Sequence, residues 1–165
     1  MILGIISDSH DNLEKINQAA LVFREQGVDY IIHAGDVVAP TSLAPLMKLG
    51  IPIYAVRGNN DGETIMLNRL IESTKGRFFN GTGFVRIEGF RIGLFHEHEL
   101  PLELVEGTPL DLVIWGHNHE LYIENGKPLR INPGEACGLM TGRATIVIVK
   151  GKDGQLYEPE VIELK

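Results

Sequence analysis

The chain begins Met1-Ile2-Leu3-Gly4-Ile5-Ile6-Ser7-Asp8-Ser9-His10, and this segment sets the architecture of its first half. The continuous apolar run over 2–6 predicts a buried strand, which stops at a polar Asp-x-His motif. Apolar residues at helical spacing then predict a helix over 12–26, with Asn12 as its N-cap and Gly27 at its end. A strand, a polar turn and a helix in this order form the first half of a β-α-β unit.

Two further units of the same kind follow. Strands are predicted over 28–33 and 51–56, and helices over 41–49 and 63–73. Strands that alternate with helices imply a parallel sheet with right-handed crossovers.

The second half of the chain is rich in short strands. Strand-like runs are predicted over 77–79, 83–88, 90–95, 111–115, 120–124, 128–131, 143–149 and 155–162, with a short helix near 99–106. Turn signals separate several of them, at Glu88-Gly89, Asn125-Gly126 and Asp153-Gly154. We therefore predict an α/β fold, a two-sheet mixed β-sandwich flanked by helices, in a single domain over residues 1–165.

The composition argues against several classes of protein. The 165 residues carry 15 basic and 22 acidic side chains, a formal net charge of −7, so a nucleic-acid polymer is not an expected partner. No apolar run approaches the roughly 18 residues that a membrane span needs, and the first residues lack the basic region of a signal peptide. The single cysteine, Cys137, excludes an intrachain disulfide. We expect a cytoplasmic protein with no membrane partner.

Polar motifs follow five of the predicted strands. In chain order they are Asp8-Ser9-His10, Gly35-Asp36, Gly58-Asn59-Asn60-Asp61, His96-Glu97-His98 and Gly116-His117-Asn118-His119. In open α/β sheets, ligands bind outside the carboxyl ends of the strands, so these motifs are expected to converge. Carboxylates, imidazoles and amide oxygens are ligands that first-row divalent metals accept. Taken singly, Asp-x-His arises by chance and the glycine motifs are ordinary turns, but five together predict a pair of metal ions.

The ordered set resembles the calcineurin-like metallophosphoesterase family, whose pattern is D-x-H, then G-D, then G-N-x-[D/E], then H, then G-H-x-H. The short chain and the Asn132-Pro133-Gly134 turn resemble its small YfcE-like phosphodiesterase branch. The resemblance extends over essentially the whole chain. It implies the calcineurin-like fold and a metal-dependent hydrolase of phosphodiester bonds, in which a hydroxide bridging two metal ions attacks phosphorus.

The resemblance also implies the metal ligands. The first ion would take Asp8, His10, Asp36 and His119, and the second would take Asp36, Asn59, His96 and His117. We expect two divalent ions per chain, with Mn²⁺ the first expectation and Ni²⁺, Co²⁺, Fe²⁺ or Zn²⁺ as alternatives. The expected partners are a small-molecule phosphodiester substrate and further copies of the chain, in a homodimer or homotetramer.

The sequence departs from the family pattern near the leaving group. Asn60 stands where many members have a histidine that protonates the leaving group, so good leaving groups should suffer least. We predict Asn59 and His98 as catalytic residues, with His98 assisting substrate binding or leaving-group departure. Glu97 replaces a usual glycine, and it could crowd the pocket, supply an acid or, as we favour, face solvent.

Structural roles are expected for other polar residues near the motifs. His33 is predicted to form a hydrogen bond rather than to bind metal. Asp61 either orients His10 or a backbone group, or caps the helix over 63–73, and Asp11 and Asn12 are expected to cap the first helix. Asn118 faces the pocket or solvent, Trp115 belongs to the core, and Cys137 is a small buried residue rather than a nucleophile.

A second class of function fits the same fold. A protein-interaction scaffold that resembles the retromer subunit would have weak or no catalysis. The presence of every expected metal ligand favours the enzyme.

Overall fold

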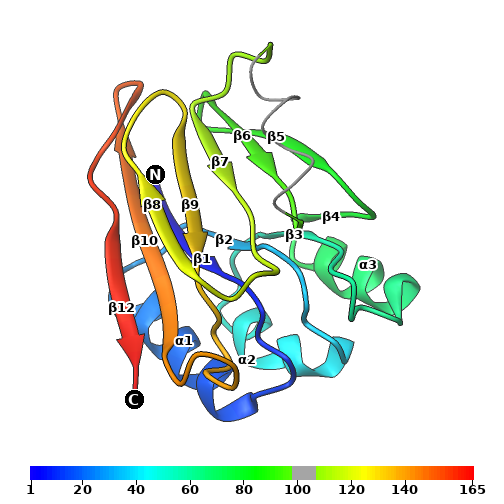
Figure 1. Ribbon diagram of the computed structural model, residues 1–165. Coiled ribbons are helices and arrows are strands. Elements are labelled where there is room, and N and C mark those ends of the chain that lie inside the picture. The colour runs from blue at the N-terminus through cyan, green and yellow to red at the C-terminus, as the bar shows by residue number, and fades with distance from the viewer. Residues whose placement is uncertain (98–106) are drawn as a thin grey trace.

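The computed structural model describes residues 1–97 and 107–165. The helix predicted near 99–106 and the predicted catalytic residue His98 lie outside the described residues. Two β-sheets pack face to face, and helices cover the outer face of the larger sheet (Figure 1).

The larger sheet is built on the predicted parallel units. Its parallel strands are β1 (Ile2–Ile6), β2 (Tyr30–His33), β3 (Ile53–Val56) and β4 (Arg77–Phe79). The strands β10 (Ala144–Lys152), β11 (Gln155–Leu156) and β12 (Glu160–Leu164) extend it antiparallel beyond β1. The strand order is β11-β10-β1-β2-β3-β4, with β12 also paired to β10.

Three helical segments pack on the outer face of this sheet. They are α1 (Leu13–Glu25), the 3₁₀ turn η1 (Pro40–Leu43) continued by α2 (Ala44–Met47), and α3 (Thr64–Ser73). Successive residues of β1 point to opposite faces, so Ile6 packs among the helices while Leu3 and Ile5 face the second sheet. Gly4 leaves room for a helix residue, because a Cβ there would lie 2.7 Å from the Phe23 ring.

The second sheet is mixed. It consists of β5 (Gly83–Ile87), β6 (Phe90–Leu94), β7 (Leu112–Ile114), β9 (Leu129–Pro133) and β8 (Leu121–Glu124), in that spatial order. The core between the sheets is aliphatic, with fully buried Ile92, Leu112 and Ile131 facing Leu3 and Ile5. All the helices of residues 1–97 and 107–165 are too short or too polar to span a bilayer.

The predicted fold class is confirmed, and two elements need correction. The helix predicted over 41–49 is a 3₁₀ turn followed by one turn of α-helix, because Pro45 lies inside the predicted range and has no N–H to donate to the carbonyl of residue 41. The strand predicted over 155–162 is two strands. Gly151 pairs with Leu156 and Ile148 pairs with Glu160, so the 156–160 segment has one residue more than its partner, and Pro159 lies in this bulge.

Candidate metal centre

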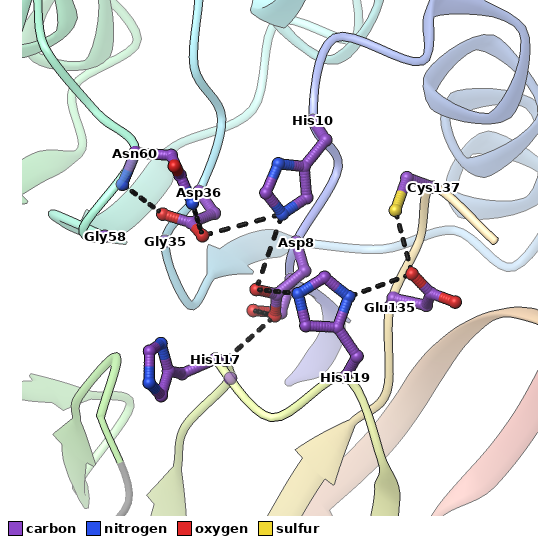
Figure 2. A network of polar contacts seen from close by, with 12 residues as sticks. Asp8, His10, Gly35, Asp36, Gly58, Asn60, His117, His119, Glu135 and Cys137 are labelled. Carbon is purple, nitrogen blue, oxygen red and sulfur yellow. Dashed lines mark hydrogen bonds and ion pairs between the residues drawn. The ribbon is translucent and has the colours of Figure 1, made fainter. Parts of the chain in front are cut away.

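The predicted metal residues come together at one edge of the two sheets. The larger sheet supplies Asp8 and His10 after β1, Asp36 after β2 and Asn59 after β3. The second sheet supplies His96 after β6, and His117 and His119 after β7. Figure 2 shows Asp8 in the middle of this group, with His10, His119 and Asp36 around it.

Their donor atoms form two clusters. In the first, Asp8 Oδ1 lies 3.9 Å from His10 Nε2 and 3.6 Å from His119 Nε2, and His10 Nε2 lies 3.5 Å from Asp36 Oδ2. The second cluster begins at the other oxygen of the same carboxylate, since Asp36 Oδ1 lies 3.5 Å from His96 Nε2.

Asn59 completes the second cluster. Its Oδ1 lies 2.9 Å from His96 Nε2 and 2.9 Å from His117 Nδ1. Asp36 therefore presents one oxygen to each cluster, as a bridging ligand would.

The donor set fits divalent metal ions. Ligand atoms bound about 2.0–2.2 Å from one ion lie roughly 3–3.6 Å apart, close to most of these separations. Asp8 Oδ1 and His10 Nε2 are buried, and across residues 1–97 and 107–165 neither has a hydrogen-bond partner. A buried polar atom without a partner is costly, and a shared cation would satisfy both atoms.

Hydrogen bonds at the far side of two rings fix their tautomers. His96 Nδ1 lies 2.8 Å from the Ala34 carbonyl oxygen, so this nitrogen carries the proton and donates. His119 Nδ1 lies 2.9 Å from Glu135 Oε2 and donates in the same way. With Nδ1 as the donor, Nε2 is in each ring the nitrogen that can bind a metal ion, which in His96 would replace the contact with Asp36.

Burial and hydrogen bonds have opposite effects on the pKa of a carboxylate, and the net shift is upward for Asp8 and downward for Asp36. Burial raises the pKa of Asp8, and the hydrogen bond from the Ser7 hydroxyl only partly offsets this. For Asp36, burial also acts to raise the pKa, but hydrogen bonds from His96 and Asn60 outweigh it and hold the pKa below its usual range. Burial lowers the pKa of His96, whereas its bonds to Asp36 and Ala34 raise it, with a net rise.

The backbone of the site adopts an uncommon conformation. Asp8, Asp36, His117 and His119 have φ angles of +49°, +57°, +73° and +64°, in the left-handed region that residues with a Cβ seldom occupy. His10, at +39°, joins them. Such strain persists only where the surrounding structure holds it, and it clusters at functional sites.

Asp61 is one of the residues that hold this backbone. It is fully buried, and its carboxylate accepts hydrogen bonds from the backbone N–H groups of Gly58 (2.7 Å), Asp36 (3.1 Å) and Val38 (2.8 Å). The interpretation in which Asp61 orients backbone groups is therefore correct. The helix-cap interpretation is wrong, because the N-cap of α3 is Glu63.

Glu135 is a second supporting residue, and no pattern in the sequence singles it out. Besides the His119 ring, its fully buried carboxylate accepts Cys137 Sγ–H at 3.0 Å and the N–H of Met140 at 2.9 Å, together with both donors of Thr141. Burial alone would raise its pKa, but bonds from Cys137, His119 and Thr141 lower it to about 2. Burial and this bond raise the pKa of Cys137 to about 12, so Cys137 is a buried thiol, as predicted.

His33 has the predicted structural role. Its ring is fully buried, with Nδ1 accepting from the Gly35 N–H at 3.2 Å and Nε2 donating to Ser9 Oγ at 2.9 Å. Burial lowers its pKa to about 4.

Of the other residues near the motifs, some have the predicted role and one does not. Asn12 caps α1 as predicted, whereas Asp11 does not, since its carboxylate accepts from the Ala39 N–H. Asn118 Oδ1 accepts from buried Asn132 Nδ2 at 2.7 Å, which anchors the His117–His119 turn. Trp115 is buried in a cluster outside the second sheet, and Glu97 is exposed, both as expected.

A two-sheet α/β sandwich with two donor clusters that share one carboxylate defines a dinuclear metallohydrolase. Residues 1–154 match the family described as the calcineurin-like phosphoesterase superfamily domain, and the chain belongs to this family. Its members hydrolyse phosphoester bonds with a dinuclear divalent metal centre. The predicted family and the predicted class of activity are confirmed.

Similar proteins extend over nearly the whole chain. A phosphodiesterase of Methanocaldococcus jannaschii is 36% identical over 153 residues, which cover 90% of this chain and 92% of that protein. A solved archaeal phosphodiesterase is 34% identical with a TM-score of 0.90, covering 99% of this chain and 100% of that one. More distant structures share the fold, among them YfcE of E. coli (21% identity, TM-score 0.69, covering 97% and 98%) and Vps29 of Entamoeba histolytica (19%, 0.67, covering 100% of each).

Proposed function

We propose that the chain is a phosphodiesterase that hydrolyses small-molecule phosphodiesters with two divalent metal ions. The first ion is held by Asp8, His10, Asp36 and His119, and the second by Asp36, Asn59, His96 and His117. The observation that carries the proposal is the Asp36 carboxylate, whose two oxygens face separate donor clusters. A relative named as a phosphodiesterase at 36% identity supports a diester substrate.

Each residue has a part in this chemistry. When bound, two divalent ions lower the pKa of water and offset the charge on phosphoryl oxygens. The Asp36 carboxylate would keep the two ions at a fixed distance from each other. Asn60 holds this carboxylate in place through its backbone N–H (2.8 Å) and its side-chain amide (2.7 Å). Asn59 adds an oxygen without a negative charge, which favours an anionic phosphate.

Mn²⁺ is the metal that we propose, with Ni²⁺, Co²⁺, Fe²⁺ and Zn²⁺ as alternatives. The ligands proposed for both ions are nitrogen and oxygen atoms, which suit these metals. The nearby Cys137 thiol donates a hydrogen bond to Glu135 and has a raised pKa, so it does not offer a soft thiolate ligand.

A residue other than Asn60 must protonate the leaving group, because the side-chain amide of Asn60 donates to Asp36. We propose that His98 assists substrate binding or leaving-group departure. His98→Ala should then lower kcat/KM for a poor leaving group more than for nitrophenolate. Equal loss for both would contradict the assignment.

The test is hydrolysis of bis(p-nitrophenyl) phosphate by chelator-stripped protein, with and without Mn²⁺. We expect turnover only with metal, and loss of at least about 100-fold in Asp36→Asn, since the shared ligand is weakened in both sites. The matched control is Asp153→Asn, an exposed turn residue between β10 and β11, which should keep full activity. Folded protein that shows no turnover with any of the candidate metals would favour the scaffold.

The proposal also includes the domain organisation, the location and the assembly of the chain. We propose one domain over residues 1–165, a cytoplasmic location and a homodimer or homotetramer. Light scattering on the purified chain measures the assembly, and cell fractionation the location.

A further inference from the structure

A cavity of about 280 Å³ adjoins the candidate metal centre. Loops after β3, β4 and β6 form its walls, with residues 57–59, 80–82 and 95–97. Two of these residues, Asn59 and His96, also belong to the second donor cluster. A larger cavity of about 630 Å³ near the β10–β11 turn shares no residue with the centre. Of these two cavities, the smaller one is therefore the one that a molecule with its phosphoryl group at the metal residues can reach.

Arg57 gives this cavity a cation. It follows the last residue of β3, and its backbone N–H donates to the Phe79 carbonyl at 2.8 Å. Its side chain is exposed and makes no ion pair or side-chain hydrogen bond with residues 1–97 and 107–165. Because the whole chain carries a net charge of −7, this guanidinium is not part of a generally basic surface.

The other walls of the cavity offer polar groups. Asn80 and Thr82 are exposed, and their side chains are without hydrogen-bond partners in the same described ranges. Phe95 is buried and supplies an apolar wall, and exposed Glu97 adds one carboxylate. Such a mixture suits an organic group with hydroxyls and a charge, rather than a purely apolar one.

We propose that this cavity binds the second ester group of the substrate, and that Arg57 binds an additional phosphate on that group. The inference rests on the proposed function, in which the metal ions take up the charge of the scissile phosphodiester. The Arg57 guanidinium lies outside both donor clusters and has no ion pair within the described part of the chain, so a further anion would match its charge. Guanidinium pairs with phosphate through two parallel N–H donors. The preferred substrates are phosphodiesters whose second ester group is itself phosphorylated.

Two substrates that differ only in that phosphate test the proposal. They are thymidine 5′-(p-nitrophenyl phosphate) and its 3′-phosphorylated form, which release the same leaving group. We expect kcat/KM of the Mn²⁺-loaded protein to be about tenfold higher for the 3′-phosphorylated substrate, and the ratio to shrink in high salt. Arg57→Gln should bring the ratio to about one. Arg86→Gln, an exposed arginine on β5 outside the cavity, should leave the ratio unchanged.

A binding measurement separates this inference from the proposed function. Calorimetry compares thymidine 3′,5′-bisphosphate with thymidine 5′-phosphate on the metal-loaded protein, and the bisphosphate should bind about tenfold more tightly unless Arg57 is replaced. That preference without any hydrolysis would support the subsite and overturn the phosphodiesterase. Hydrolysis of both substrates at equal kcat/KM, with equal binding, would overturn the subsite alone. An equal loss for both ligands in Arg57→Gln would place Arg57 at the scissile phosphate and also overturn it.

Discussion

Glu135 links the candidate metal centre to the loop that follows β9. One of its oxygens accepts from the His119 ring, and the same carboxylate accepts from the backbone of Leu139, Met140 and Thr141. A carboxylate behind a metal-binding imidazole fixes the ring and increases its basicity. The strength of metal binding at the first position should therefore depend on a residue that is not itself a proposed ligand.

Glu135→Gln should weaken metal binding, because the amide keeps the shape but loses the charge and one acceptor oxygen. We expect the Mn²⁺ affinity of the weakened position to fall by about 10–100-fold, measured by calorimetric titration of chelator-stripped protein. Glu158→Gln, at an exposed position, is the matched control. Unchanged affinity in a Glu135→Gln protein with native thermal unfolding would show that the ring needs no such partner.

Asn60 leads to a prediction about the leaving group. Its hydrogen bonds hold Asp36 in place, but its amide has no acidic proton to transfer. Replacing it by histidine should therefore supply a proton donor. With aryl methyl phosphates, Asn60→His should raise kcat for the phenyl ester relative to the p-nitrophenyl ester by about tenfold or more. Asn60→Ala, which only removes the bond to Asp36, should lower both rates alike. A histidine variant that behaves like the alanine variant would refute the prediction.

At this scale the sequence predicted the donors and left two roles open for Asp61, but it did not mark Glu135 as a supporting residue. The proposed ligands fall at strand ends, which local apolar runs reveal. Glu135 and Asp61 act on partners brought close by the fold: Asp61 bonds the N–H of Asp36, 25 positions away, and Glu135 bonds His119, 16 positions away. No local spacing marks such a contact, so a buried carboxylate in a turn is indistinguishable from an exposed one.

Among the elements, the loops after the strands depend on close contact between backbones. Gly58 packs directly on Asp36, so an added Cβ would collide with the Asp36 carboxylate and its backbone N–H. The N–H belongs to the backbone, and Asn60 holds the carboxylate in place through two hydrogen bonds, so neither group can move aside easily. The β3 loop must therefore move if Gly58 acquires a side chain.

Gly58→Ala should displace Asp36 and abolish most activity, and it should cost about 1–3 kcal/mol of stability. Gly62→Ala is the matched control, since a Cβ there meets nothing within 4 Å. Steady-state kinetics and urea unfolding of both variants measure the two effects. Full activity in Gly58→Ala would mean that the loop adapts and that the geometry of Asp36 is not critical.

Helices and strands were predictable where the apolar residues followed a single regular spacing. The run over 2–6 and the helix over 12–26 match β1 and α1 within one residue at each end. The helix over 41–49 and the strand over 155–162 were wrong because prolines act on hydrogen bonds that apolar periodicity does not report. The structure of such segments depends on which strands they pair with, and this pairing is a property of the whole sheet.

Across the whole molecule, the candidate centre joins the two sheets. Each donor cluster takes residues from both, since His119 meets Asp8 in the first cluster and His96 meets Asp36 in the second. Ions bound there stabilise the packed sheets by mass action, by about 2.7 kcal/mol per site at a hundredfold excess over Kd. Mn²⁺ should thus raise the thermal unfolding temperature of stripped protein, and Asp36→Asn should lose most of this increase. An increase that persists in Asp36→Asn would locate metal binding elsewhere.

The buried His33 ring makes the stability of the whole fold depend on pH. Its pKa is about 4 in the folded chain against 6.5 for a free histidine, so between these values the unfolded chain binds more protons. Stability is therefore complete above about pH 6.5 and falls as the pH drops towards 4, by up to about 3 kcal/mol from this group. In His33→Gln, which keeps a donor and an acceptor for Ser9 and Gly35, the loss between pH 7 and pH 4.5 should be about 2 kcal/mol smaller. Urea unfolding of both metal-free proteins measures it, and because all other titrating groups are shared, equal losses would show that His33 is protonated without cost in the folded chain.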